Sequence, residues 1–270
     1  MNRKRILSVA VLIVAIVFGV ISHAQSKDLV LVIGATPVPH AEILEKAKVL
    51  LAAKGVNLQI KVFTDYMTPN LALNDKSLDA NYFQHLPYLE DFNNANKSQL
   101  VSAGTVHYEP LAIYSKKIKD LKELQAGEKV AIPNDVSNEA RALILLQDNG
   151  IIKLKSPGDL NASIKDIASY SVKIELVEIE AAQLPRVLGS VSAAVINGNY
   201  AIDAGLSPLT DALASESSTS IAAKTYANLV AVRKGDEDRP EIKELLTVLH
   251  SDQIMQFIKE RYKGAVIPIE

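Results

Sequence analysis

Residues 79–88 (DANYFQHLPY) bring together several side chains that could bind or transform a small molecule. Three aromatic rings, an imidazole and two carboxamides stand there, although the protein has no tryptophan and only 5% of its residues are aromatic. Rings with polar edges can surround a small, partly apolar ligand and still offer it hydrogen-bond partners. One such ring would more often serve only the core. The group as a whole favours a ligand site.

Catalysis is the alternative interpretation. In that case His85 of this stretch, or His107 further along the chain, would act as a base. The sequence lacks a phosphate-binding loop, an H-E-x-x-H zinc pair, a G-x-S-x-G elbow and a G-x-G-x-x-G turn. No carboxylate lies at a recognisable metal-ligand spacing from either histidine, and a lone histidine is more often a hydrogen-bonded pocket or core residue. We therefore expect no enzyme, no metal site and no cofactor.

Composition sets broad limits on the partners. A chain of 270 residues with 48% hydrophobic residues can form a substantial core, in one large domain or two lobes. The net charge of −2 and the absence of a basic stripe give no reason to expect nucleic acid. There is no cysteine, so disulfides, thiolate sites and a lipid-accepting thiol are excluded from this sequence.

The first residues resemble a targeting signal. Arg3, Lys4 and Arg5 precede an apolar run over residues 6–21, and the small residues Ser22 and Ala24 suit a cleavage site. We expect residues 1–24 to be a signal peptide that is removed, with an uncleaved membrane anchor as the alternative. The expected location is the periplasm or the exterior, without lipid anchoring.

The remaining pattern predicts two α/β lobes. Residues 29–33 form a continuous apolar run typical of a buried strand, a helical pattern begins at His40 and ends near Gly55, and residues 58–62 alternate like a strand. A strand, a helix and a strand imply a parallel pair with a crossover. Further expected elements are a short helix at 70–73 and extended segments at 100–106 and 110–114.

The second lobe is expected to begin at the polar, basic segment 115–120. Ser137 is the expected N-cap of a helix that ends at Gly150, and Arg141 would lie near its positive end, where an anion is favoured. Asn197 directly follows a predicted strand, at the edge where ligands of open α/β sheets bind. The other expected elements are strands at 129–133, 173–179, 193–196 and 226–233, helices at 182–188, 240–249 and 252–262, and a surface connection over 207–224.

Six stretches resemble the NlpA/MetQ family of substrate-binding proteins, which deliver methionine to an ABC transporter. They stand in the family's order and span nearly the whole chain after residue 24. The stretches are ANYFQHLPYL (80–89), YSKKI (114–118), IPND (132–135), QLPR (183–186), AVIN (194–197) and YANL (226–229). The chain departs from the family at Ala24 and Gln25, where most members have a lipid-bearing cysteine.

The resemblance implies the type II periplasmic-binding-protein fold, with an amino acid held in the cleft between two α/β lobes. The lobes would comprise residues 25–114 with 229–270, and residues 115–228. In this family an arginine pairs with the ligand carboxylate, asparagines hold the ligand backbone, and aromatic residues with a histidine surround the thioether. Carried onto this sequence, these roles fall on Arg141, on Asn197 and Asn228, and on Tyr66, Phe83, His85 and Tyr88.

The resemblance also implies a function. A guanidinium can bind a carboxylate through two parallel hydrogen bonds, and sulfur packs favourably against ring edges. We expect a soluble monomer that captures L-methionine or a close analogue and docks onto a membrane permease. Other small apolar amino acids are alternative ligands, because Tyr82 and residues 107–110 vary among relatives. An enzyme on the same scaffold and a surface interaction protein with a vestigial cleft are the rival interpretations.

Overall fold

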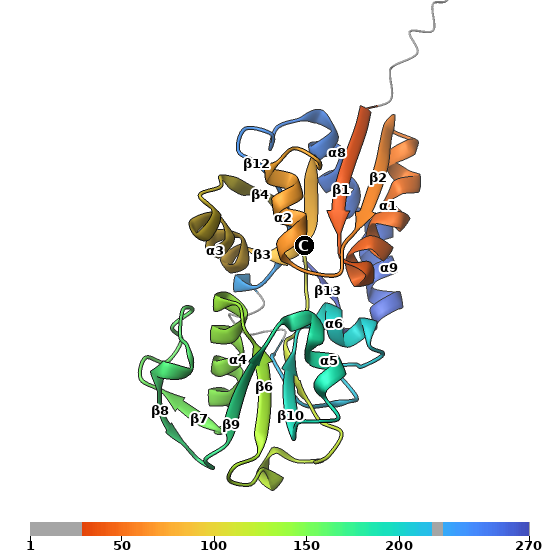
Figure 1. Cartoon of the computed structure of the whole chain (residues 1–270). Coiled ribbons are helices and arrows are strands. Elements are labelled where there is room, and N and C mark those ends of the chain that lie inside the picture. Colours follow the sequence, from red (N-terminus) through yellow and green to blue (C-terminus); the bar gives the residue numbers. More distant parts are fainter. Residues whose placement is uncertain (1–28, 218–223, 270) are drawn as a thin grey trace, which may run out of the picture.

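The computed structural model describes residues 29–217 and 224–269, which form two α/β lobes stacked one above the other (Figure 1). The expected signal peptide lies outside the described residues. Within the described ranges, no helix combines the length and the apolar character needed to cross a membrane.

The first lobe is built on a six-stranded mixed sheet with the order β13-β4-β12-β3-β1-β2. Strands β1, β2 and β3 are parallel to one another, whereas β12 pairs antiparallel with both β3 and β4. Its elements are β1 (Leu29–Ala35), the turn η1 (Pro37–Ala41), α1 (Glu42–Ala52), β2 (Val56–Val62), α2 (Met67–Asn74), β3 (Ala80–His85), α3 (Leu86–Asn96), β4 (Leu100–Tyr108), β12 (Asn228–Arg233), α8 (Pro240–Leu249), α9 (Asp252–Tyr262) and β13 (Ile267–Pro268).

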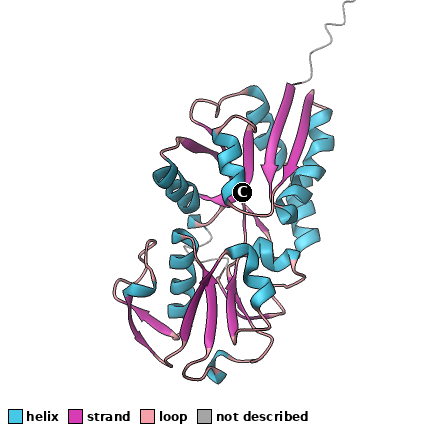
Figure 2. Cartoon of the chain, viewed as in Figure 1, coloured by secondary structure: helices cyan, strands magenta, loops and turns pink. Residues whose placement is uncertain are grey.

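Helices cover both faces of this sheet (Figure 2). Helices α1, α8 and α9 pack on one face around a core that includes Ile33, Leu44 and Leu245. Helices α2 and α3 pack on the other face around Leu73 and Phe92. A sheet buried on both faces explains the uninterrupted apolar run that predicted β1.

The second lobe repeats this plan on a five-stranded sheet with the order β11-β5-β10-β6-β9. Strand β6 is parallel to β9 and β10, and β5 is antiparallel to β10 and β11. Helix α4 covers one face, and α5 and α6 cover the other. Its elements are β5 (Ala112–Tyr114), η2 (Leu121–Glu123), β6 (Lys129–Pro133), α4 (Val136–Asp148), β7 (Ile152–Leu154), η3 (Ile164–Asp166), β8 (Ile167–Tyr170), β9 (Glu175–Ile179), η4 (Ala181–Gln183), α5 (Leu184–Val187), β10 (Ala193–Ile196), α6 (Gly198–Asp203) and β11 (Ala212–Ser215).

Two expectations about the second lobe need correction, and one pair of strands was missed. Strand β5 pairs with β10 and β11, so the chain crosses between the lobes at residues 109–111, before β5, and not after residue 114. The supposed surface connection at 207–224 contains β11, which is too short and too poor in large apolar residues to give a strand pattern. The hairpin of β7 and β8 was not anticipated at all.

Candidate functional site

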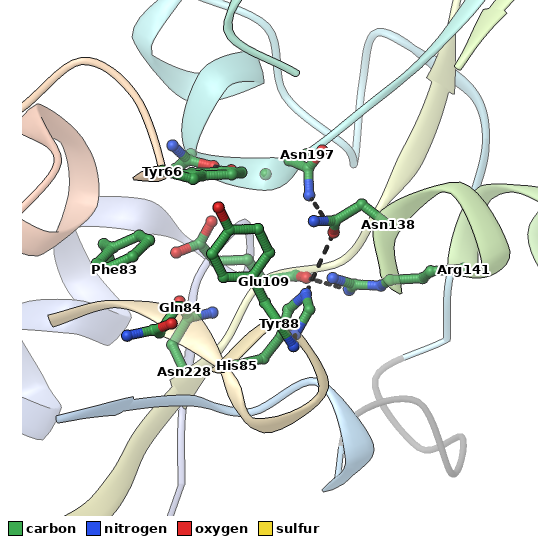
Figure 3. Close-up of a pocket in the computed structure, with 12 residues that line it drawn as sticks. Tyr66, Phe83, Gln84, His85, Tyr88, Glu109, Asn138, Arg141, Asn197 and Asn228 are labelled. Atoms are coloured by element: carbon green, nitrogen blue, oxygen red, sulfur yellow. Dashed lines mark hydrogen bonds between the residues drawn. The ribbon is translucent and has the colours of Figure 1, made fainter. Parts of the chain in front are cut away.

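A cavity lies where the carboxyl ends of parallel strands from both lobes face each other (Figure 3). Strand β3 ends at His85, β6 at Pro133 and β10 at Ile196. The cavity, including its mouth, has about 330 Å³ free of protein atoms. Its lining residues are Tyr66, Phe83, Gln84, His85, Tyr88, Glu109, Asn138, Arg141, Asn197, Gly198, Asn199 and Asn228.

All seven predicted site residues therefore line one cavity, and they divide it into an aromatic end and a polar end. At the aromatic end the ring centroid of Tyr66 lies 5.7 Å from that of Phe83 and 5.6 Å from that of Tyr88. The centroids of Phe83 and Tyr88 are 6.1 Å apart. Three mutually contacting rings form a pocket wall suited to an apolar side chain.

The residues of the stretch 79–88, which predicted the site, have different roles in the structure. His85 caps α3, where its Nδ1 accepts the main-chain N–H of Tyr88 at 3.3 Å. The amides of Asn81 and Gln84 are instead engaged with Asn70 in a buried amide cluster, with hydrogen bonds of 2.7 to 2.8 Å. The two carboxamides thus hold α2 against β3, and the rings of Phe83 and Tyr88 with the imidazole of His85 are the parts of this stretch that remain to face a ligand.

A chain of hydrogen bonds fixes the orientation of Asn197 at the polar end. Oδ1 of Asp135 accepts from Nδ2 of Asn138 at 2.7 Å. Oδ1 of Asn138 in turn accepts from Nδ2 of Asn197 at 2.7 Å and faces Nε2 of His85 at 3.2 Å. Because the amide nitrogen of Asn197 is used in this way, its buried Oδ1 is left without a hydrogen-bond partner among the described residues.

Asp135, and not Ser137, is the N-cap of α4. Its carboxylate also accepts the main-chain N–H of Asn138 at 3.0 Å. The carboxylate precedes the helix by one residue and offers a stronger acceptor than a serine hydroxyl placed two residues later. The correction matters for the site, because the same carboxylate starts the chain of bonds that ends at Asn197.

Arg141 is 4% exposed and projects from the second turn of α4 into the space between the lobes. Its Nε and Nη2 donate to Glu216 at 2.8 and 2.6 Å, and Nη2 also donates to the main-chain oxygen of Glu109 at 2.9 Å. Its guanidinium lies 4.3 Å from the ring centroid of Tyr226. Burial alone would lower the pKa of Arg141, but the carboxylate of Glu216 raises it above its usual value.

This pairing changes what Arg141 can offer a ligand. The bidentate edge of the guanidinium is already occupied by Glu216, so a carboxylate in the cavity would meet Nη1 and not the Nε and Nη2 pair. The expectation of a two-bond clamp between Arg141 and a ligand is therefore not met in this arrangement of the lobes.

The side-chain amide of Asn228 is oriented oppositely to that of Asn197, because its oxygen and not its nitrogen is engaged by a neighbouring residue. Its Oδ1 faces Nε2 of His40 at 2.9 Å. Burial lowers the pKa of His40 to about 4, so the ring is neutral at pH 7 and its Nδ1 is held at 2.7 Å by the hydroxyl of Thr36. A ring whose Nδ1 accepts from a hydroxyl carries its proton on Nε2. Asn228 accordingly turns its amide N–H groups away from His40.

Direct contacts join the two lobes across the cavity. The hydroxyl of Tyr66 donates to Oδ1 of Asn199 at 2.5 Å, and the hydroxyl of Tyr200 donates to the main-chain oxygen of Thr64 at 3.2 Å. On the other side, His85 of the first lobe bonds Asn138 of the second. The lobes are closed around the cavity.

Five of the lining residues were not predicted from the sequence: Gln84, Glu109, Asn138, Gly198 and Asn199. Asn138 could have been found, because it stands three residues before Arg141 and so shares its face of the helix. Glu109 carried no local signal, since it lies in the crossing between the lobes.

The expectation that no carboxylate accompanies His107 also fails. Nε2 of His107 lies 2.6 Å from Oε1 of Glu109, and Nε2 of His40 lies 3.4 Å from the same oxygen. Ligand atoms of these three buried residues all lie within 4.8 Å of one another, a spacing that could hold a metal ion. Both nitrogens of each ring already have hydrogen-bond partners, so the group is also complete as a hydrogen-bond network.

Two α/β lobes joined by two crossings, with a closed cavity at their facing sheet edges, define a binding protein of the type II periplasmic class. The chain belongs to the NlpA lipoprotein family, whose profile matches residues 31–270.

Individual relatives agree over nearly the full length. The methionine-binding lipoprotein MetQ of Bacillus subtilis is 43% identical over 250 residues, which cover 91% of this chain and 90% of the relative. A nutrient-binding protein from Burkholderia cenocepacia, solved bound to methionine, is 45% identical with a TM-score of 0.84, covering 89% of this chain and 100% of that one. A periplasmic substrate-binding protein of an ABC transporter from Coxiella burnetii is 45% identical with a TM-score of 0.83, covering 88% and 100%.

These names overturn one expectation. The family is a lipoprotein family, and the B. subtilis relative is itself named a lipoprotein. The prediction that lipid anchoring is absent was therefore wrong. It rested on one missing residue type near the start of the sequence, which is a weaker ground than membership of a family of lipoproteins.

Proposed function

We propose that this protein is the substrate-binding component of an ABC transporter and captures L-methionine, or a close analogue, between its lobes. The relatives named above bind methionine or serve an ABC transporter according to their names. The roles assigned to Arg141, Asn197, Asn228 and the aromatic residues belong to the same proposal. We also propose that the protein acts as a monomer and that residues 1–24 direct its export.

One observation carries the proposal: the polar end of the cavity offers both hydrogen-bond donors and a hydrogen-bond acceptor. Asn197 presents an unpaired acceptor. Asn228 has its Oδ1 engaged by His40, which leaves its Nδ2 as a donor, and Arg141 has Nε and Nη2 engaged by Glu216, which leaves Nη1. A zwitterionic amino acid matches this arrangement, because its ammonium group donates and its carboxylate accepts. A buried Oδ1 without a partner has an energetic cost that a ligand donor would remove.

The aromatic end supports a flexible apolar side chain. Tyr66, Phe83 and Tyr88 surround that end with ring faces and edges. A thioether sulfur gains about 0.3 to 1.5 kcal/mol against an aromatic ring, which favours methionine modestly over an amino acid of the same shape. Leucine and norleucine are consequently the ligands with which methionine should be compared.

The histidines support binding and not catalysis. Both nitrogens of His85 are engaged, by the N–H of Tyr88 and by Asn138. Those of His107 are engaged by Tyr82 and Glu109. A general base needs a nitrogen directed at the substrate, and neither ring has one to spare in the closed arrangement.

Delivery to a permease follows from lobe closure. A ligand that touches both lobes binds the closed state better and so populates it, and a membrane partner can then distinguish loaded from empty protein. The chain has no nucleotide-binding loop, so the energy for uptake would come from the transporter's ATPase.

Isothermal titration calorimetry on protein that has been unfolded, dialysed and refolded tests the proposal. We expect saturable one-to-one binding of at least one enantiomer of methionine, with weaker binding of norleucine and leucine. Absence of heat with both enantiomers and with these analogues would overturn the assignment. Light scattering of the same sample checks the monomeric state.

A further inference from the structure

Helix α6 lies at the junction of the two lobes, against the turn η1 of the first lobe (Figure 1). It directly follows Asn197, one of the proposed ligand-binding residues. Two of its side chains, Tyr200 and Ile202, contact the first lobe. Neither is among the described residues that line the cavity, so their contacts hold the lobes together without touching a ligand.

The lobes exchange apolar side chains along α6. Tyr66 belongs to the first lobe but packs against the second-lobe core cluster that contains Ile196. Ile202 belongs to the second lobe but packs against the first-lobe core cluster that contains Ile33. Separation of the lobes would expose apolar surface on both side chains, and burial of such surface is favourable. The exchange therefore stabilises the closed arrangement.

Tyr200 fixes the position of Tyr66 in this junction. The centroids of the two rings are 4.9 Å apart, and their planes are tilted by 33°. The hydroxyl of Tyr200 donates to the main-chain oxygen of Thr64 at 3.2 Å, two residues before Tyr66. The hydroxyl of Tyr66 donates to Oδ1 of Asn199 at 2.5 Å. Helix α6 thus holds both the ring of Tyr66 and the loop that carries it.

Tyr66 connects this junction to the cavity. Its ring lines the aromatic end together with Phe83 and Tyr88, which are residues of its own lobe (Figure 3). Of the ring contacts that Tyr66 makes among the described residues, only the one with Tyr200 comes from the second lobe. Opening of the lobes would break that contact and release the ring from its place beside the ligand side chain.

We propose that Tyr200 is a positioning residue that sets how long the ligand stays bound. It holds Tyr66 over the ligand side chain in the closed state and does not touch the ligand itself. The inference rests on the proposed function of the cavity. A ligand enters while the lobes are open, so contacts formed only on closure slow its release and leave its capture unchanged.

Binding kinetics test this role in the wild type, Tyr200→Phe and Tyr200→Leu. Release is measured with radiolabelled L-methionine chased by unlabelled ligand, and association by stopped-flow tyrosine fluorescence. Loss of the hydrogen bond in Tyr200→Phe should raise the release rate about 2- to 10-fold. Loss of the ring contact as well, in Tyr200→Leu, should raise it about 5- to 100-fold. The association rate should stay at the wild-type value.

Tyr114 provides the matched control. It belongs to the same second-lobe core cluster as Tyr200, and its buried hydroxyl has no hydrogen-bond partner among the described residues. Tyr114→Phe and Tyr114→Leu therefore make the same changes without a contact to the first lobe, and they should release L-methionine at the wild-type rate. Equal acceleration in the Tyr114 and Tyr200 variants would overturn the inference, because a general loosening of the second lobe would then explain both.

A double-mutant cycle tests whether Tyr200 acts through Tyr66. In a Tyr66→Leu background the ring contact is already lost, so Tyr200→Leu should accelerate release by a smaller factor than in the wild type. Equal factors in the two backgrounds would overturn this route.

The remaining outcomes separate the inference from the function on which it rests. Unchanged release in the Tyr200 variants, or slower association alone, would overturn the inference while L-methionine binding by the wild type stands. If Tyr200→Leu does not fold, Tyr200→Phe decides the question, because it keeps the ring. A wild type that retains no L-methionine would overturn the inference together with the assignment of this ligand.

Discussion

Arg141 and Glu216 form a buried ion pair in which Nε and Nη2 of the guanidinium each donate to a different carboxylate oxygen. Glu216 also accepts from the hydroxyl of Tyr108 at 2.6 Å and from the main-chain N–H of Leu111 at 2.9 Å. The pair connects α4 to the segment after β11 and to the first crossing. It is therefore as much a structural junction as a part of the cavity wall.

Removal of the negative charge at this junction should destabilise the fold. Glu216→Gln leaves Arg141 buried and charged, and we expect the free energy of unfolding to fall by about 3 to 5 kcal/mol. Urea denaturation measures this loss in the free energy of unfolding. Glu175→Gln is the matched control, because its pair with Lys129 is more than half exposed on both sides and should contribute at most about 1 kcal/mol. A similar small loss in both variants would contradict the prediction.

Loss of the unpaired acceptor on Asn197 should weaken ligand binding, and the same change removes the hydrogen bond from Nδ2 of Asn197 to Asn138. Asn197→Leu keeps the approximate volume but offers no hydrogen bond to an ammonium group. A hydrogen bond to a charged group contributes about 1.5 to 3 kcal/mol, so affinity for methionine should fall about 10- to 150-fold by calorimetry. The exposed Asn161→Leu is the control. Unchanged affinity in Asn197→Leu would remove this residue from the site.

Sulfur selectivity should depend on the aromatic end of the cavity. The wild type is expected to prefer methionine over norleucine by about 2- to 10-fold, since the two ligands differ only in sulfur for methylene. Phe83→Leu should reduce that preference. Phe257→Leu makes the same change on α9, away from the cavity, and should preserve it. Equal preferences in the two variants would show that the ring of Phe83 does not contact the sulfur.

Acidification should destabilise the folded protein between pH 6.5 and about 4. Burial lowers the pKa of His40 to about 4 and those of His85 and His107 to about 3, from 6.5 in the unfolded chain. The unfolded state therefore binds more protons in this window, and stability falls with pH by about 1.4 kcal/mol per pH unit for each histidine. Burial raises the pKa of Glu109, which opposes part of this loss.

The slope of stability against pH isolates one of these groups. His107→Gln removes one titrating ring, so the fall in stability between pH 6.5 and 4 should be shallower by about 1.4 kcal/mol per pH unit, whatever the stability at pH 7. Urea denaturation at several pH values measures both slopes. Identical slopes would mean that His107 binds its proton equally in the folded and unfolded states.

The local pattern of the sequence was sufficient for most elements of the fold. The apolar run of β1, the helical spacing of α1, α8 and α9, and the alternation in β2 depend on which residues are buried a few positions apart, so they can be read along the chain. The cluster of rings around Phe83 and Tyr88, and the position of Arg141 near the start of a helix, likewise depend on neighbours in sequence.

Relations between distant residues were decided only by the tertiary structure. The partner of Arg141 is Glu216, 75 residues later, and Asn228 meets His40 across 188 residues. Which atom of each asparagine faces the cavity depends on these long-range bonds, because an amide can donate from one side and accept on the other. Residue types therefore indicated a small-ligand site, and the family resemblance implied an amino acid as its ligand. The pairing of Arg141 and the direction of the hydrogen bonds came from packing.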